Sequence, residues 1–159
     1  MTYEDLSERI LMELQRDGRQ SFRELAETFD VSPTTIRKRV EDLEQSGVLK
    51  GVRAEIDYEK LGYSYVAMLR LKVAGEAIEV ALEQVGRHPE FTNIYEITGD
   101  YDILCVGYFR NRDHLNTVIK EVQRSSSVRS TNTSMILNPY REHAPLPLVD
   151  EEERNREER

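Results

Sequence analysis

The chain has 159 residues and a mass of 18.5 kDa, enough for one medium-sized domain or two small ones, which excludes a large multidomain enzyme. Asp and Glu total 30 against 22 Lys and Arg, so the formal net charge is −8. A surface that binds a polyanion must therefore be a local basic patch. No stretch approaches the roughly 18 apolar residues of a membrane span, and the N-terminal residues do not resemble a signal peptide. We expect a cytoplasmic protein.

The charged residues, the cysteine and the histidines bear on the host environment and on metal binding. Of the 22 cations, 17 are Arg and 5 are Lys. With the excess of carboxylates, this bias predicts a halophile with a salty cytoplasm, and an ordinary acidic protein is the alternative. Cys105 is the single cysteine, so it cannot form an internal disulfide, and its apolar neighbours predict a buried side chain. The three histidines show no metal-ligand spacing, so we expect no metal and no cofactor.

Residues 1–56 predict a winged helix-turn-helix domain. A first helix ends near Gly18, where the residue type permits positive φ. A second helix opens at Ser21, and Glu24 three residues later completes a capping box. A third helix opens at Ser32, followed by a proline that loses no hydrogen bond at the first helical position. Residues 48–56 then predict a small hairpin or wing.

The remainder of the chain predicts a ferredoxin-like domain over residues 64–149, after a linker at 57–63. The pattern reads strand, helix, strand, strand, helix, strand, and this βαββαβ order is typical of a sheet with helices on one face. The fold class is therefore α+β, with a winged helix-turn-helix before a ferredoxin-like domain. Residues 150–159 are dense in Glu and Arg and predict a disordered, charged tail.

The sheet's second face predicts self-association. Along the third strand, Ile103 and Cys105 alternate with Leu104 and Val106, so both faces of this strand are apolar. Helices cover only one side of such a sheet, and the other would expose a larger apolar patch than monomers usually tolerate. We expect a second copy to cover it in a two-fold dimer.

The third helix predicts a DNA-reading surface. Thr34 and Lys38 fall opposite the apolar stripe of this helix, with Thr35 and Arg37 beside them. Arg39 fits either a phosphate contact or a structural ion pair. A packing unit with a solvated cationic face is the alternative interpretation of the whole segment. The residues predicted to contact double-stranded DNA are Ser32, Thr34, Thr35, Arg37, Lys38 and Arg39.

Two segments resemble one known family. The run SFRELAETFDVSPTTIRKRVEDLEQSGVL and the run EITGDYDILCVGYFRNRDHLNTVIKEVQRSSSVRSTNTSMIL are similar to the leucine-responsive and asparagine-type (Lrp/AsnC, feast/famine) regulators. The resemblance implies a transcriptional regulator whose ferredoxin-like domains dimerise and often assemble further into octamers. It also implies that an amino acid or related small molecule commonly binds between subunits. Two positions depart from the family pattern: Asp30 replaces the usual turn glycine, and residues 124–128 lack the usual Gly-Val ending.

The resemblance also implies an effector site, and the residue types are chemically suited to one. A carboxylate at Asp100 or Asp102 can pair with an ammonium group, while turn amides and strand hydroxyls can hold a carboxylate. A plain hairpin turn beside a polar strand is the alternative. The predicted effector-binding residues are Gly99, Asp100, Tyr101, Asp102, Thr131, Thr133 and Ser134.

Two other functions fit the same architecture. Tetrapyrrole (sirohaem) decarboxylases resemble the family in overall fold, but they resemble one another in a His- and Tyr-containing segment where this chain has residues 93–97 and no histidine. A ligand-sensing partner that no longer binds DNA is the other. We therefore predict no catalytic residues, and a sequence-specific DNA-binding regulator controlled by a small molecule.

Overall fold

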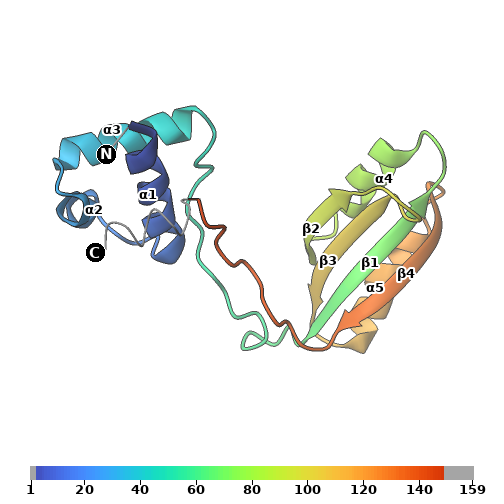
Figure 1. Ribbon diagram of the computed structural model, residues 1–159. Coiled ribbons are helices and arrows are strands. Elements are labelled where there is room, and N and C mark those ends of the chain that lie inside the picture. The colour runs from blue at the N-terminus through green and yellow to red at the C-terminus, as the bar shows by residue number, and fades with distance from the viewer. Residues whose placement is uncertain (1–2, 149–159) are drawn as a thin grey trace. The chain divides into compact units, whose positions relative to one another are not determined.

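The computed structural model describes residues 3–148, with side chains from residue 6 onward (Figure 1). Residues 3–55 and 141–148 belong to one compact unit, and Ile56–Tyr140 form the other. The predicted domain boundaries stay a prediction, and the predicted tail at 150–159 lies outside the described residues. No helix in the described part of the chain is long and apolar enough to cross a membrane.

The first unit contains the three predicted helices, α1 (Tyr3–Arg16), α2 (Phe22–Phe29) and α3 (Pro33–Gln45). The predicted capping box is confirmed, since Glu24 N–H donates to Ser21 Oγ at 3.2 Å while Ser21 N–H donates to the Glu24 carboxylate at 2.7 Å. One apolar stripe from each helix meets in a single core. Its buried members are Leu6, Ile10, Leu25, Ala26, Phe29, Ile36 and Val40.

The hairpin expected over residues 48–56 does not form. Residues 49–57 run without helix, strand, turn or bend. Leu49 gives the physical reason, because its N–H donates to the carbonyl of Leu43 at 3.0 Å and its side chain packs against the helical core. That amide is therefore not available for a strand ladder. Beyond Leu49 the segment is exposed, with Val52 at 56% and Ile56 at 44%.

The second unit has the predicted βαββαβ order. Its elements are β1 (Tyr65–Val73), α4 (Ile78–Val85), β2 (Phe91–Glu96), β3 (Ile103–Phe109), α5 (Arg112–Gln123) and β4 (Val128–Ile136). The strands form one antiparallel sheet in the order β2-β3-β1-β4, as Figure 1 shows. Both helices pack their buried residues into the same core as alternate residues of the strands. This is the ferredoxin-like architecture expected from the sequence.

The sheet has two faces of different character. Leu69 and Ile103 point toward the helices and are fully buried, whereas Met68 and Leu104 point to the opposite face and are half-buried. We call this second surface, which no helix of the described chain covers, the open face. Cys105 belongs to the helix side, as expected of a buried thiol, and burial raises its pKa to about 12.

Residues 57–63, which we predict as a linker, form a hydrogen-bonded turn docked on β3. Tyr63 N–H donates to the carbonyl of Tyr58 at 3.0 Å. The ring of Tyr58 lies 4.8 Å from that of Tyr108, and the guanidinium of Arg110 lies 4.5 Å from the ring centre of Tyr63 while donating to its hydroxyl. These contacts fix the turn to the second unit.

Candidate nucleic-acid interface and ligand-binding face

Helix α3 carries its predicted DNA-contacting residues in its N-terminal half. Thr34, Arg37 and Lys38 are exposed, whereas Ile36 and Val40 are buried in the helical core. The cationic side chains therefore lie on the side of the helix that faces away from the buried core. This arrangement suits insertion into a major groove.

Two of the predicted contacts also build the start of the helix. Ser32 is the N-cap, and its hydroxyl accepts from Thr35 N–H at 3.1 Å while lying 2.9 Å from Thr35 Oγ1. Thr35 and Arg39 are half-buried. The guanidinium of Arg37 lies 5.9 Å from the ring centre of Phe22, so it rests against the first residue of α2. Capping and packing thus preorganise this surface.

The turn between α2 and α3 depends on Asp30. This residue adopts the left-handed conformation at φ 51°, and its N–H donates to the carbonyl of Ala26 as the C-cap of α2. The expectation that aspartate tolerates this conformation is confirmed, because its short polar side chain makes positive φ less costly than for most residues. The substitution of the usual glycine therefore preserves the turn.

The turn at residues 99–102 is tied firmly to β1 through Asp102. Val73 N–H donates to Asp102 Oδ2 at 2.7 Å, and Lys72 Nζ lies 3.0 Å from Oδ1. These interactions, led by the backbone hydrogen bond, lower the pKa of the Asp102 carboxyl. Gly99 adopts φ 113°, which requires glycine. Asp102 is therefore engaged inside its own domain, while Asp100 is exposed.

Arg70 is a polar residue beside the turn that the sequence analysis missed. Its Nη2 donates to Ser134 Oγ at 2.8 Å, and its guanidinium lies 5.6 Å from the ring centre of Tyr101. Its Nε is buried and has no hydrogen-bond partner within the described residues. Arg70 thereby joins β1, the turn and β4 on the open face. The sequence did contain a signal for this role, because Arg70 is a charged residue that alternates with the buried apolar residues of β1.

The predicted effector residues of β4 do not all share one face. Ser134 pairs with Met68 on the open face, while Thr131 and Thr133 pair with Leu71 and Leu69 and so point to the helix side. The hydroxyl of Thr131 accepts from Gln123 of α5 at 2.6 Å. Within one copy, the structure brings together Tyr101 and Ser134 around Arg70 and leaves the two threonines on the other side.

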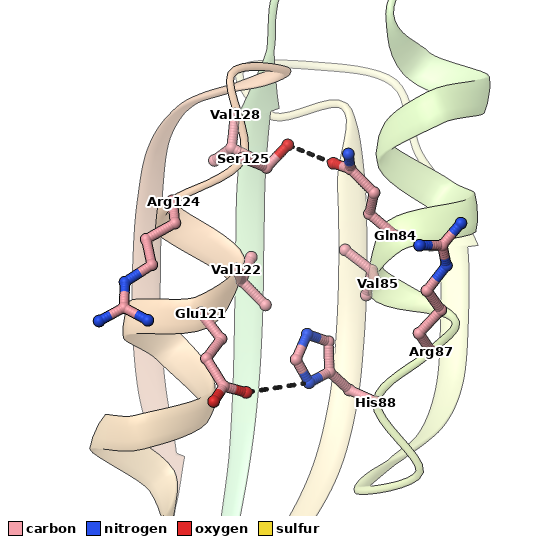
Figure 2. A pocket seen from close by; sticks show the side chains of 9 residues that line it. All are labelled: Gln84, Val85, Arg87, His88, Glu121, Val122, Arg124, Ser125 and Val128. Carbon is pink, nitrogen blue, oxygen red and sulfur yellow. Dashed lines mark hydrogen bonds and ion pairs between the residues drawn. The ribbon is translucent and has the colours of Figure 1, made fainter.

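A separate cavity of about 400 Å³ lies between the ends of α4 and α5 (Figure 2). Two polar links cross it: Ser125 hydrogen bonds to Gln84, and His88 Nδ1 lies 3.8 Å from Glu121 Oε2. In Figure 2 the guanidinium groups of Arg87 and Arg124 diverge from the cavity. None of the predicted effector residues lines it. Its lining is Gln84, Val85, Arg87, His88, Glu121, Val122, Arg124, Ser125 and Val128.

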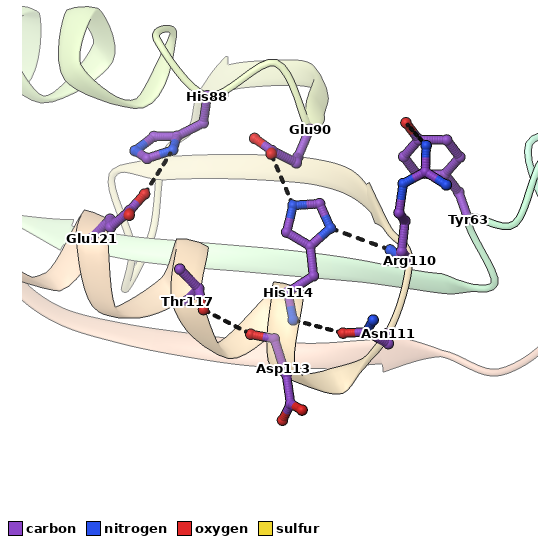
Figure 3. A network of polar contacts seen from close by, with 9 residues as sticks. All are labelled: Tyr63, His88, Glu90, Arg110, Asn111, Asp113, His114, Thr117 and Glu121. Carbon is purple, nitrogen blue, oxygen red and sulfur yellow. Dashed lines mark hydrogen bonds and ion pairs between the residues drawn. The ribbon is translucent and has the colours of Figure 1, made fainter.

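A polar network fixes the start of α5 (Figure 3). His114 Nε2 lies 3.0 Å from Glu90 Oε1, and its Nδ1 accepts from the N–H of Arg110 at 3.3 Å. Asn111 caps the helix by accepting from His114 N–H at 2.8 Å. The imidazole therefore links the residue after β3, helix α5 and the loop before β2. No cluster of potential metal ligands occurs among residues that the structure describes.

Comparisons with known proteins match both units. The Lrp/AsnC ligand-binding domain matches residues 66–146, and a winged helix-turn-helix DNA-binding domain matches residues 3–50. An HTH-type transcriptional regulator of Pyrococcus furiosus is 36% identical over 142 residues, covering 89% of this chain and 96% of the relative. The regulator FL11 of Pyrococcus horikoshii is 34% identical over 146 residues, covering 91% and 96%.

Solved structures agree with these matches. The chain is similar to Escherichia coli AsnC with a TM-score of 0.84 and 30% identity, covering 92% of this chain and all of the other. It is also similar to a Neisseria meningitidis transcriptional regulator in complex with L-Met, with a TM-score of 0.85 and 25% identity, covering 92% and 97%. The relatives are named as regulators rather than enzymes. The chain therefore belongs to the Lrp/AsnC family of DNA-binding transcriptional regulators.

Proposed function

We propose that this regulator binds double-stranded DNA as a cytoplasmic homodimer, that α3 reads the bases, and that an amino acid or related small molecule modulates binding. The supporting observation is the exposed cationic surface of α3 in a chain of net charge −8. Thr34, Arg37 and Lys38 supply base contacts, because Lys and Arg donate to guanine acceptors in the major groove. Ser32, Thr35 and Arg39 supply phosphate contacts.

The charge gradient along α3 orients the helix toward DNA. The cations Arg37 and Lys38 lie in its first turns, whereas the exposed carboxylates of Glu41 and Glu44 follow near its end. The partial positive charge of the helix N-terminus adds to the cations. Phosphates are therefore attracted to the N-terminal half and repelled from the other, so the helix enters the groove with its N-terminal half first.

Self-association through the open face would present two such helices. Val66, Met68, Leu104 and Val106 give this face an apolar centre. Covering it with a second copy removes the exposed apolar area without changing the helix side. A two-fold dimer then favours a pseudo-palindromic operator with half-sites about 34 Å apart.

The effector is proposed to bind at the turn of residues 99–102. Because Asp102 is held by Lys72 and Val73, we assign the ammonium contact to the exposed Asp100. Turn amides, Tyr101 and the hydroxyl of Ser134 would complete the site on the open face. Thr131 and Thr133 point to the helix side of their own sheet in either copy, so they are left out of the proposed site. In calorimetric titrations with a panel of amino acids, Asp100→Asn should abolish binding and Asp113→Asn should not.

The test of DNA recognition compares Lys38→Ala with Lys120→Ala on a duplex selected from a random library by the wild-type protein. Lys120 is an exposed lysine of α5, so its variant makes the same charge change away from α3. Loss of a good base contact lowers affinity for the selected duplex by roughly 5- to 150-fold. The loss on random duplex should be smaller, and Lys120→Ala should leave both affinities unchanged. Equal losses on both duplexes would contradict base reading by Lys38.

A further inference from the structure

Arg70 lies at the rim of the open face, beside the turn before β3 that carries the proposed effector site. Leu71, the next residue of β1, accepts from Asp102 N–H at 2.9 Å, so the turn closes against this part of the strand. The guanidinium of Arg70 lies 5.6 Å from the ring centre of Tyr101 and donates through Nη2 to Ser134 Oγ at 2.8 Å. Tyr101 and Ser134 are both assigned to the effector site, so Arg70 brings a positive charge into it.

This charge has no counter-ion within the described part of the chain. Arg70 forms no ion pair there, and its hydrogen bond to Ser134 is the only one that its guanidinium makes. The neighbouring carboxylate, Asp102, is already held by Lys72 Nζ at 3.0 Å and by Val73 N–H at 2.7 Å. The Nε of Arg70 is buried and lacks an acceptor among these residues. Because buried N–H groups normally have an acceptor, the guanidinium is suited to receive an anion from outside.

The strands of a second copy cannot supply that anion. The strand residues that point to the open face are the even-numbered residues 66–72 of β1, 104–108 of β3 and 130–136 of β4, together with Asn93 and Tyr95 of β2. None of these residues is Asp or Glu. Two open faces packed together would therefore bring in two Arg70 guanidiniums without a strand carboxylate for either. Burying an unpaired charge is costly, so the rim of this interface requires an anion.

We propose that Arg70 binds the carboxylate group of the effector, so that the site recognises both charges of an amino acid. A guanidinium donates two N–H groups to the two oxygens of a carboxylate at once, and such an acceptor would satisfy the buried Nε. The exposed Asp100 takes the ammonium group at the same turn. This inference rests on the proposed effector binding at residues 99–102, and it adds the residue that selects amino acids over amines.

The α-amide of an amino acid isolates this contact. The amide keeps the ammonium group and the side chain of the amino acid, but it carries no negative charge. Its binding therefore loses a charge-assisted hydrogen bond and leaves Arg70 without a counter-ion. The wild type should bind an amino acid roughly 10- to 150-fold more tightly than the corresponding amide.

Calorimetric titrations of the full chain with two matched panels test the assignment. The panels are the L-amino acids and the corresponding L-amino acid amides, at about pH 6, where the α-amino groups are protonated. Arg70→Gln keeps a side-chain amide that can donate to Ser134 but has no charge, so the preference for the amino acid over its amide should disappear. Arg70→Lys keeps the charge without the two-pronged geometry and should retain part of the preference.

Arg110→Gln is the matched control. Arg110 lies just beyond the end of β3 that is remote from the turn, and it is an exposed arginine that also contacts one ring and one hydroxyl, both of Tyr63. Its variant makes the same change of charge and should keep the full preference. Lost stability alone would weaken binding of both panels equally, so the ratio of the two affinities separates a ligand contact from a structural role.

The outcomes separate the two proposals. A wild type that binds neither panel would overturn the proposed effector binding and the role of Arg70 with it. A wild type that binds amino acids, combined with an Arg70→Gln variant that keeps the full preference over the amides, would overturn the role of Arg70 alone. Weaker self-association of Arg70→Gln in sedimentation, with that preference unchanged, would instead assign the anion to the second copy and would also overturn the inference.

Discussion

Ser32 offers a test that separates building α3 from binding DNA. Its hydroxyl accepts from Thr35 N–H at 3.1 Å as the N-cap, and the same hydroxyl is a proposed phosphate contact. Ser32→Ala removes both roles. Loss of an N-cap costs about 1 kcal/mol, which corresponds to roughly 4–8 °C in melting temperature for a domain of this size. The amide of Thr35 should also exchange faster with solvent.

Ser32→Asp separates the two roles. Aspartate caps helices as well as serine and adds a charge that the helix N-terminus favours, so the melting temperature should equal or exceed that of the wild type. Toward DNA the effect reverses. A carboxylate about 4 Å from a phosphate adds about 1 kcal/mol of repulsion in water, besides the lost hydrogen bond of about 1 kcal/mol. Affinity for the selected duplex should fall by about 30-fold at low salt.

The assays are thermal unfolding followed by circular dichroism, hydrogen exchange at the Thr35 amide, and DNA binding at several salt concentrations. Stability and DNA affinity should rank the two variants in opposite order. Ser32→Ala should be less stable than Ser32→Asp and should bind DNA more tightly. An unchanged melting temperature for Ser32→Ala would refute the capping argument. Wild-type affinity for Ser32→Asp would remove Ser32 from the phosphate contacts.

Two further predictions concern the ligand-binding unit. Because the pKa of Asp102 is lowered, its contribution to stability is present above the unfolded pKa of about 3.9 and disappears as pH falls through the folded pKa. The difference in melting temperature between wild type and Asp102→Asn should therefore be full at pH 7 and close below about pH 4. A difference that persists at pH 2 would contradict this. Gly107→Ala places a Cβ 2.8 Å from Phe91 Cδ1, 2.9 Å from Phe109 Cζ and 3.0 Å from the carbonyl oxygen of Glu90. Chemical denaturation should therefore show that the free energy of unfolding falls by about 1–3 kcal/mol, and adding Phe91→Leu should partly restore it. A fall below about 0.5 kcal/mol would show that the sheet relaxes freely.

Local signals predicted the helices of the first unit well. The Ser21 and Glu24 capping box, the Ser32 cap and the left-handed Asp30 each depend on residues within a few positions of one another, so the sequence alone determines them. The strands followed from the alternation of apolar residues, since one face of the sheet is buried by helices. Cys105 fell on that face as predicted.

Contacts between distant segments were harder to predict. The bond between Asp102 and Lys72 joins residues 30 positions apart, and its existence depends on how the turn returns toward β1. The separation of Thr131 from Ser134 is different, because strand periodicity places odd and even residues on opposite faces. That information was present in the sequence, and the effector set inferred from family resemblance did not use it.

The expected wing shows a third reason why part of the structure could not be predicted from the sequence. Residues 52–56 have the alternation of a strand, but a strand needs a partner, and Leu49 is already bound to the helical core. A sequence pattern identifies a segment able to pair without identifying what it pairs with. The acidic, arginine-rich composition likewise predicts a salty host, which stays a prediction to be tested by unfolding at different potassium chloride concentrations.

The chain passes between the two units twice, and the first of these connections, before β1, is anchored at both ends, which limits its conformational entropy. Val52 rests against Gly18 at one end, and the Tyr58 turn is clamped to β3 at the other. Between these two contacts, residues 53–56 form no helix, strand, turn or bend. Ordering four residues costs about 4–8 kcal/mol, far less than freezing a long flexible connector. The conformational entropy lost on ordering this connection is therefore small enough for a few new contacts to offset.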